Sequence, residues 1–229
     1  ESFQDALEQF KNDLKEYYQD EMCQLPLLPW LEDNEMKHID DIFVDLELAT
    51  KKEKLENYEA LVTIKHPTRK GRFATRVLVV GDPGSGKTSL MSKIAYSWSQ
   101  NHPGLAQFEL VFYLRMRELH CCNNVRHCLR RGASVEVTDC SLLGEVLQEM
   151  PRCGVDRNQL EKYMESNPGK VLMLLDGWDE SVLSEADLER ANGTTPEHDI
   201  ENLLMCKKQP SSCIIVTSRP YKSLGKKVQ

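Results

Sequence analysis

The stretch RVLVVGDPGSGKTSL, residues 76–90, decides the fold. It opens with an apolar run of the kind that forms a strand buried in a parallel sheet. It continues through the pattern G-x-x-x-x-G-K-[ST], which spans Gly81 to Thr88 and leads into a helical pattern. In a strand–loop–helix unit of this kind, backbone N–H groups at the helix N-terminus cradle a phosphate. The stretch therefore predicts a phosphate-binding α/β fold.

The rest of the chain repeats the alternation of strand and helix. Apolar runs at 108–114, 170–176 and 213–219 predict three more buried strands. Helical patterns occupy 88–98, 141–150 and 158–165, and the first of them places Leu90, Ile94, Ala95 and Trp98 on one side. Strands that alternate with helices predict a three-layer P-loop NTPase fold with a mainly parallel sheet.

The glycine-rich loop carries the first group of predicted site residues. Lys87 is expected to neutralise the β and γ phosphates, and the Thr88 hydroxyl to ligate Mg²⁺. The residues expected to contact the nucleotide phosphates are Gly81, Asp82, Pro83, Gly84, Ser85, Gly86, Lys87, Thr88 and Ser89. The alternative is a glycine-rich turn between strand and helix that binds no ligand.

Acidic residues follow the third apolar run, in the stretch VLMLLDGWDE. Because ligands bind at the carboxyl ends of parallel strands, Asp176 is expected to hold Mg²⁺ through water. Asp179 and Glu180 are expected to orient or activate a water for attack on the γ-phosphate. The alternative is a helix N-terminus rich in acidic residues, which is common.

The last apolar run ends in TSRP, where Thr217 and Ser218 precede Arg219. A guanidinium at this edge of the sheet predicts a sensor of the γ-phosphate. The alternative is a strand end capped by solvated residues.

An N-terminal flank, residues 1–71, precedes this core at 72–229. Its first helix is expected to be capped by Ser2 with Asp5 and to carry an apolar stripe formed by Phe3, Leu7, Phe10, Leu14 and Tyr17. The segment 39–48 alternates apolar and polar residues, which predicts a short half-buried strand. Residues 65–72 predict a basic turn that links the flank to the core.

Composition and absent motifs exclude several function classes. The net charge of −7 argues against nucleic-acid binding, and no apolar run approaches the roughly 20 residues of a membrane span. The sequence has no N-K-x-D motif of Ras-like GTPases and no LSGGQ-like stretch of transporter ATPases. The His/Cys cluster at 120–128 predicts a polar insert with incidental thiols, and a zinc site is the alternative.

Taken together, GDPGSGKTSL, LMLLDGWDE and VTSRP resemble the NACHT domain of NOD-like receptors. In ring-forming motor ATPases the Asp-Glu pair follows the apolar run directly, whereas here Gly177 and Trp178 intervene. The resemblance implies that the upstream segment folds back near the adenine, with Ile42, Phe43 and Val44 as base contacts. Thr68 and Arg69 are further candidates. It also implies helical and winged-helix domains that complete the ADP pocket and lie outside residues 72–229.

The resemblance implies a cytoplasmic innate-immune switch that binds ATP or ADP with Mg²⁺, hydrolyses ATP slowly and self-associates through the NACHT domain. Adaptor or effector proteins are expected to bind through other domains, with no nucleic acid or membrane partner. The competing hypothesis is a P-loop enzyme with true turnover, either a small-molecule kinase or a motor ATPase.

Overall fold

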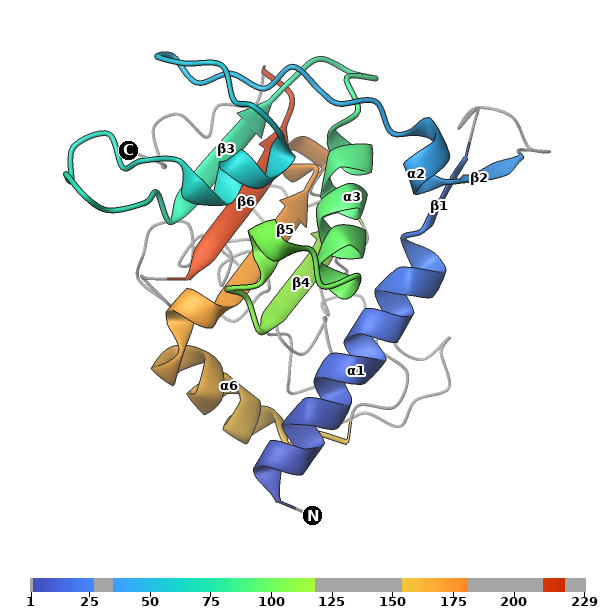
Figure 1. The fold of residues 1–229 in the computed structure, drawn as a ribbon, viewed down its shortest axis with the longest axis vertical. Coiled ribbons are helices and arrows are strands. Elements are labelled where there is room, and N and C mark those ends of the chain that lie inside the picture. The colour runs from blue at the N-terminus through green and yellow to red at the C-terminus, as the bar shows by residue number, and fades with distance from the viewer. Residues whose placement is uncertain (1, 27–34, 118–153, 181–211, 221–229) are drawn as a thin grey trace, which may run out of the picture.

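The computed structural model describes residues 2–26, 35–117, 154–180 and 212–220. Its centre is a four-stranded sheet in the order β3-β6-β5-β4, in which every neighbouring pair is parallel (Figure 1). The strands are β3 (Arg76–Val80), β4 (Leu110–Arg115), β5 (Val171–Asp176) and β6 (Cys213–Ser218). The predicted α/β fold with a parallel sheet is therefore confirmed.

The four strands differ in burial. Every residue of β5 and β6 is buried, as expected for strands with a partner on each side. The β3 strand pairs only with β6 among the described residues, and there only Val77 is buried while Val80 is 52% exposed. The run 76–80 therefore forms the predicted parallel strand, but it is less buried than its apolar sequence suggested.

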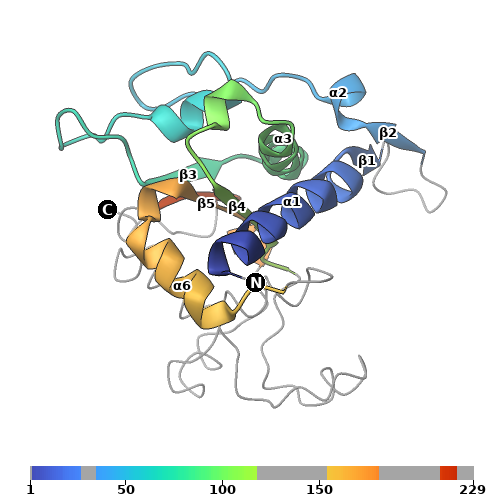
Figure 2. The ribbon, with the colours of Figure 1, turned by 60° about the horizontal axis from the view of Figure 1, so that its bottom comes forward.

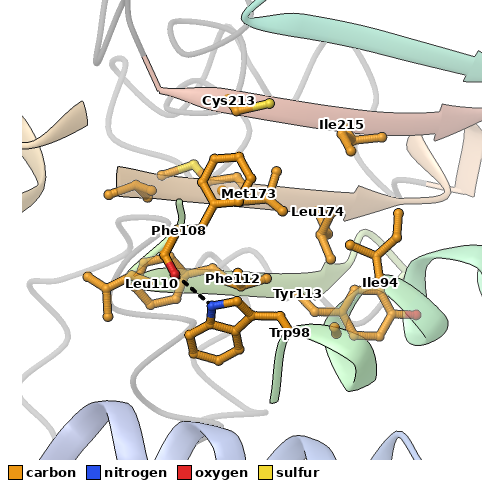
Figure 3. Close-up of a cluster of buried hydrophobic side chains, with 14 of the residues drawn as sticks. Ile94, Trp98, Phe108, Leu110, Phe112, Tyr113, Met173, Leu174, Cys213 and Ile215 are labelled. Carbon is orange, nitrogen blue, oxygen red and sulfur yellow. Dashed lines mark hydrogen bonds between the residues drawn. The ribbon is translucent and has the colours of Figure 1, made fainter. Parts of the chain in front are cut away.

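The helix α3 (Lys87–Ser99) packs its apolar side on the sheet. The side predicted from the sequence is confirmed, because Leu90, Ile94, Ala95 and Trp98 are all buried. The Trp98 indole donates a hydrogen bond of 2.8 Å to the carbonyl of Phe108, just before β4 (Figure 3). This bond satisfies a polar group inside the main hydrophobic cluster.

The helix α1 (Phe3–Glu21) lies beside α3 and next to β4 (Figure 2). Its predicted capping box is present, with Ser2 and Asp5 each accepting a hydrogen bond from the other's backbone N–H. The buried face ends at Tyr18 rather than at the predicted Tyr17, which is only half-buried. Tyr18 follows Leu14 by four residues, a spacing that keeps both on one face of the helix.

The Tyr18 hydroxyl binds the backbone of β4 on the side away from β5. It donates to the carbonyl of Val111 and accepts from the amide of Tyr113, both at 2.9 Å. These groups would otherwise be unpaired donors and acceptors at the edge of the described sheet. The N-terminal helix thus covers the β4 edge and shares one hydrophobic cluster with the core.

The segment 39–48 does not form the predicted strand. Residues Ile39–Ile42 form the short helix α2, whose first turn contains Asp40 and is capped by His38. No regular structure follows from 43 to 48, and Val44 is 76% exposed. The alternation arises because Leu46 and Leu48 pack against the core individually, without a partner strand.

The remaining elements are short. They are β1 (Gln24–Pro26), β2 (Met36–His38), η1 (Tyr58–Thr63), η2 (Pro103–Leu105), α6 (Arg157–Ser166), η4 (Pro168–Lys170) and η5 (Trp178–Glu180). The helix α6 confirms the pattern predicted over 158–165. The basic turn is also present, closed by an antiparallel bridge between Lys65 and Phe73. The helix predicted over 141–150 lies outside the described residues.

Candidate functional site

The glycine-rich loop connects the end of β3 to the start of α3, as predicted. Gly86 caps the helix with φ at +81°, a conformation that glycine adopts without strain. A Cβ at this position would also lie 3.2 Å from a methyl carbon of Leu46. No side chain caps α3, so the amides of its first turn are available to an anion.

Lys87 folds back over the loop that precedes it. Its Nζ donates to the carbonyls of Gly81 at 2.7 Å and Asp82 at 2.8 Å, and lies 3.3 Å from the hydroxyl of Ser85. The ammonium group is therefore held within the loop where phosphates would bind. Of the other predicted loop residues, Pro83, Gly84 and Thr88 are exposed and Ser89 is half-buried.

The end of β6 lies directly beside the start of this loop. The amide of Gly81 donates to the carbonyl of Ser218 at 3.2 Å, which continues the pairing of β3 with β6. Because all four strands are parallel, their carboxyl ends share this edge of the sheet. The structure therefore brings the glycine-rich loop, Asp176 and Arg219 to the same edge, as the sequence predicted.

Asp176 is held at the end of β5 by two hydroxyl groups. Thr217 donates to its Oδ1 at 2.6 Å, and the Tyr113 hydroxyl lies 3.4 Å from its Oδ2. The Thr217 hydroxyl also accepts from the amide of Gly177 at 2.8 Å. Asp176 as a residue is only 7% exposed, so these contacts restrict the directions in which its carboxylate can face a ligand.

Burial also acts on the tyrosine beside this carboxylate. It raises the pKa of Tyr113 to about 12, and the negative charge of Asp176 acts in the same direction. The phenol is therefore neutral at physiological pH and can act as a hydrogen-bond donor. The guanidinium of Arg115 lies 5.7 Å from the centre of the tyrosine ring.

Arg219 contacts both of the other predicted acidic residues. Its amide donates to Asp179 Oδ1 at 2.9 Å, and its Nε lies 3.2 Å from Oδ2 of the same side chain. One terminal nitrogen lies 2.9 Å from Glu180 Oε1. The Asp179 side chain is only 8% exposed, so its charge is paired where water has little access.

The turn after β5 makes this ion-pair cluster possible. Gly177 has φ at +76°, and the amide of Glu180 donates to its carbonyl at 2.8 Å. A Cβ on Gly177 would lie 3.3 Å from a Glu180 carboxylate oxygen. The glycine therefore lets the chain turn so that both acids face Arg219 at the end of β6.

Of the three predicted base contacts, Phe43 lies against α3. Phe43 stacks edge-on against Tyr58, with ring centres 5.9 Å apart, and Lys93 of α3 lies 5.7 Å above its ring. Ile42 is half-buried and Val44 is exposed. The residue of this segment that reaches the glycine-rich loop is Leu46, which was not among the predicted base contacts.

Thr68 and Arg69 do not lie near the glycine-rich loop. They belong to the basic turn, which joins the amino-terminal end of β3 (Figure 1). The loop follows the opposite end of that strand. The length of β3 therefore separates these two residues from any nucleotide held by the loop.

The residues at this sheet edge fit a nucleotide phosphate with Mg²⁺. Uncapped helix amides and a lysine suit phosphate oxygens, while the Thr88 hydroxyl and the Asp176 carboxylate supply the oxygen ligands that Mg²⁺ prefers. Tyr113, which the sequence reading missed, supports that carboxylate. The only available signal in the sequence was its hydroxyl at the penultimate position of the apolar run 108–114.

Within the described ranges, no group of three or more His, Cys, Asp or Glu residues is placed to hold a metal. The cluster at 120–128 falls outside those ranges. None of the helices in the described part of the chain has the length and apolar character needed to cross a membrane.

Residues 75–229 match the NACHT domain. The chain is 26% identical over 159 residues to the zebrafish (Danio rerio) NACHT, LRR and PYD domains-containing protein 1 homolog, covering 67% of this chain and 10% of that protein. It is 27% identical over 144 residues to mouse (Mus musculus) NACHT, LRR and PYD domains-containing protein 10, covering 63% of this chain and 17% of that protein.

A third relative is human nucleotide-binding oligomerization domain-containing protein 2, with 29% identity over 154 residues. That match covers 64% of this chain and 13% of the relative. The chain thus spans only a small part of the length of these relatives. The NACHT match covers more than half of the chain and includes both the glycine-rich loop and the acidic turn. The chain belongs to the NACHT domain family.

Proposed function

We propose that this chain is the ATP- and ADP-binding module of a NOD-like receptor and works as a nucleotide-dependent oligomerisation switch with slow hydrolysis. The observation that carries the proposal is the juxtaposition of the glycine-rich loop with the Arg219 cluster. The glycine-rich loop binds the phosphates of the nucleotide, and the Arg219 cluster can respond to the γ-phosphate. A switch needs both functions at one site.

Each residue at the sheet edge has a proposed role. The loop amides and Lys87 bind the β and γ phosphates, and Thr88 and Asp176 hold Mg²⁺, Asp176 through water. When bound, the cation supplies charge neutralisation at the phosphates. Thr217 and Tyr113 orient the Asp176 carboxylate, and the segment that contains Phe43 and Leu46 is proposed to contact the nucleoside.

Arg219 is the proposed sensor of the γ-phosphate. It is paired with Asp179 and Glu180, so binding a γ-phosphate would require the guanidinium to exchange carboxylate partners for phosphate oxygens. That exchange would release the acids to orient an attacking water. Competition between two ion-pair arrangements makes hydrolysis slow and couples it to the nucleotide state.

The names of the relatives support the wider proposal. One of them is named for nucleotide binding and oligomerisation, and two for NACHT, LRR and PYD domains. We propose that the protein containing this chain likewise self-associates through its NACHT domain. On the same basis we place it in the cytoplasm and in innate immune signalling, with adaptor or effector proteins bound by other domains.

Substitution of Lys87 tests the proposed nucleotide site. Because its ammonium neutralises phosphate charge, Lys87→Ala is expected to abolish the thermal stabilisation that Mg-ATP gives the wild-type chain. That stabilisation is about 2.7 kcal/mol when the ligand is at 100 times its Kd. Differential scanning fluorimetry with and without Mg-ATP measures it, and Lys51→Ala is the control because Lys51 is an exposed lysine outside the site. Equal stabilisation of Lys87→Ala and wild type would contradict the proposed site.

The rate of ATP hydrolysis distinguishes the proposed switch from a P-loop enzyme with true turnover. Retained ADP and a hydrolysis rate far below one per second would support the switch. A steady-state rate of about 1–100 per second, typical of kinases, would favour the competing P-loop enzyme.

A further inference from the structure

A cavity lies at the amino-terminal ends of the strands, opposite the end of the sheet that carries the glycine-rich loop. Its volume is about 460 Å³, within the range of small-molecule sites. Residues at the amino-terminal ends of all four strands line it, namely Thr75 before β3, Phe108 before β4, Gly169 before β5 and Cys213 at the start of β6. A strand of five or six residues, roughly 17–20 Å, separates this cavity from the glycine-rich loop.

The basic turn forms one wall of the cavity through His66, Arg69 and Arg72. The Nδ1 atom of His66 accepts from the amides of Thr68 at 3.2 Å and Arg69 at 3.0 Å. The ring proton is therefore on Nε2, which makes that atom a hydrogen-bond donor. The turn is also closed by a 2.8 Å bond from the His66 amide to the Arg72 carbonyl.

The charge of this wall is not balanced within the cavity. None of the described lining residues is acidic, and the guanidinium groups of Arg69 and Arg72 make no ion pair within the described part of the chain. Burial raises the pKa of the Cys213 thiol to about 12, so this group is neutral at physiological pH. The cavity is therefore cationic in a chain whose net charge is −7.

Part of the cavity lining is apolar. Val62 and Phe108 line it and are only 4% and 5% exposed, and Cys213 lies at the start of β6 (Figure 3). Phe73 also lines the cavity and is 59% exposed. Apolar surface and uncompensated positive charge thus lie next to each other.

We infer that this cavity binds a small phosphorylated ring compound, distinct from the nucleotide at the glycine-rich loop. The two guanidinium groups and the His66 Nε2–H bind the phosphate oxygens, for which arginine has a matching planar arrangement of donors. The ring contacts Phe108, Val62 and Phe73. Size, charge and apolar surface together define this class of ligand.

Phenyl phosphate is the probe, titrated by calorimetry into the Lys87→Ala chain so that the glycine-rich loop is not a second phosphate site. It is expected to bind about tenfold more tightly than inorganic phosphate because burial of the ring adds to the affinity. Phenol is expected not to bind measurably. The double variant Arg69→Gln/Arg72→Gln is expected to weaken phenyl phosphate binding by tenfold or more, since it removes the charge-assisted hydrogen bonds.

The matched control is Lys70→Gln, which removes the positive charge between the two arginines from a side chain that does not line the cavity. It is expected to change the affinity by less than about twofold. An equal loss in Lys70→Gln and in the double variant would overturn the inference in favour of general surface charge. It would also be overturned by binding that the arginine substitutions leave unchanged, or by equal affinity for phenyl phosphate and inorganic phosphate.

Discussion

At the scale of single residues, the Thr217 hydroxyl joins β6 to the acidic turn. It donates to Asp176 and accepts from the Gly177 amide, and the residue is fully buried. Thr217→Val preserves the shape but leaves a buried carboxylate oxygen and a backbone amide without this partner. We expect the free energy of unfolding to fall by about 1–3 kcal/mol and the Mg²⁺ dependence of nucleotide binding to weaken. Urea denaturation and Mg²⁺ titrations at fixed ATP measure the two effects.

Thr217→Ser is the matched control, because it restores the hydroxyl and loses only a methyl group. It should recover the Mg²⁺ dependence. If Thr217→Val destabilised the fold while nucleotide binding kept its normal Mg²⁺ dependence, Thr217 would be structural only and would not position Asp176.

Site residues that belong to one motif with a fixed spacing could be predicted from the sequence. Site residues that come together only through folding could not. Lys87 is predictable because its place in the loop is set by the local backbone. Arg219 and Asp179 were predicted to share an edge, but their direct ion pair depends on the turn at Gly177. Leu46 and Tyr113 were missed because each meets its partner through tertiary packing, which leaves no local pattern.

At the scale of elements, the contact between α1 and β4 depends on the Tyr18 hydroxyl. Tyr18→Phe keeps the ring in the core but leaves the Val111 carbonyl and the Tyr113 amide without their partner. We expect a loss of about 2 kcal/mol or more in the free energy of unfolding, with faster hydrogen exchange at the Tyr113 amide. Denaturation and amide exchange followed by NMR measure both changes.

Tyr96→Phe serves as the control for this substitution. The Tyr96 hydroxyl also makes a hydrogen bond, at 3.2 Å to His38, but in a solvent-exposed position. Its removal should change stability by less than about 1 kcal/mol. An equal effect of the two substitutions would show that the β4 edge does not need the Tyr18 hydroxyl.

Helices were predictable where hydrophobic periodicity extended over the whole helix, and strands where an apolar run extended over the whole strand. α1, α3, α6 and the four sheet strands all follow such patterns. The failure came at 39–48, where four apolar residues in alternation matched a strand pattern. Isolated contacts of single leucines with the core produce the same alternation as a strand, so periodicity alone could not separate the two.

At the scale of the whole molecule, Glu109 links parts of the chain that are distant in sequence. Its carboxylate accepts hydrogen bonds from Lys170 at 2.6 Å, from Lys11 of α1 at 3.3 Å, and from Tyr163 of α6. The hydrogen bonds from Lys170 and Tyr163, with a smaller contribution from Lys11, lower the pKa of Glu109 to about 2. This network ties the N-terminal helix to the amino-terminal edge of the sheet.

The lowered pKa predicts how stability depends on pH. Because the carboxylate is favoured in the folded state, its contribution is complete above the unfolded pKa of about 4.3. It is lost as pH falls from there towards 2, where the folded state also becomes protonated. The difference in unfolding free energy between wild type and Glu109→Gln should therefore shrink over this interval. Denaturant unfolding at a series of pH values from 6 to 2.5 measures it.

Glu8→Gln is the control, since it removes an exposed carboxylate that also pairs with Lys11. The stability difference between wild type and Glu8→Gln should stay small throughout the series. A difference between wild type and Glu109→Gln that did not vary with pH would show that the network contributes packing rather than charge.

Because β6 lies between β3 and β5, the distance between those two strands is fixed. Two strand intervals, roughly 9–10 Å, separate the strand that leads into the glycine-rich loop from the strand that ends in Asp176. Backbone hydrogen bonds on both sides of β6 make this spacing stiff. The sheet thus fixes the distance between the glycine-rich loop and Asp176, so the proposed nucleotide-dependent movement would have to arise in the turns beyond the strand ends, where Arg219 and its acidic partners lie.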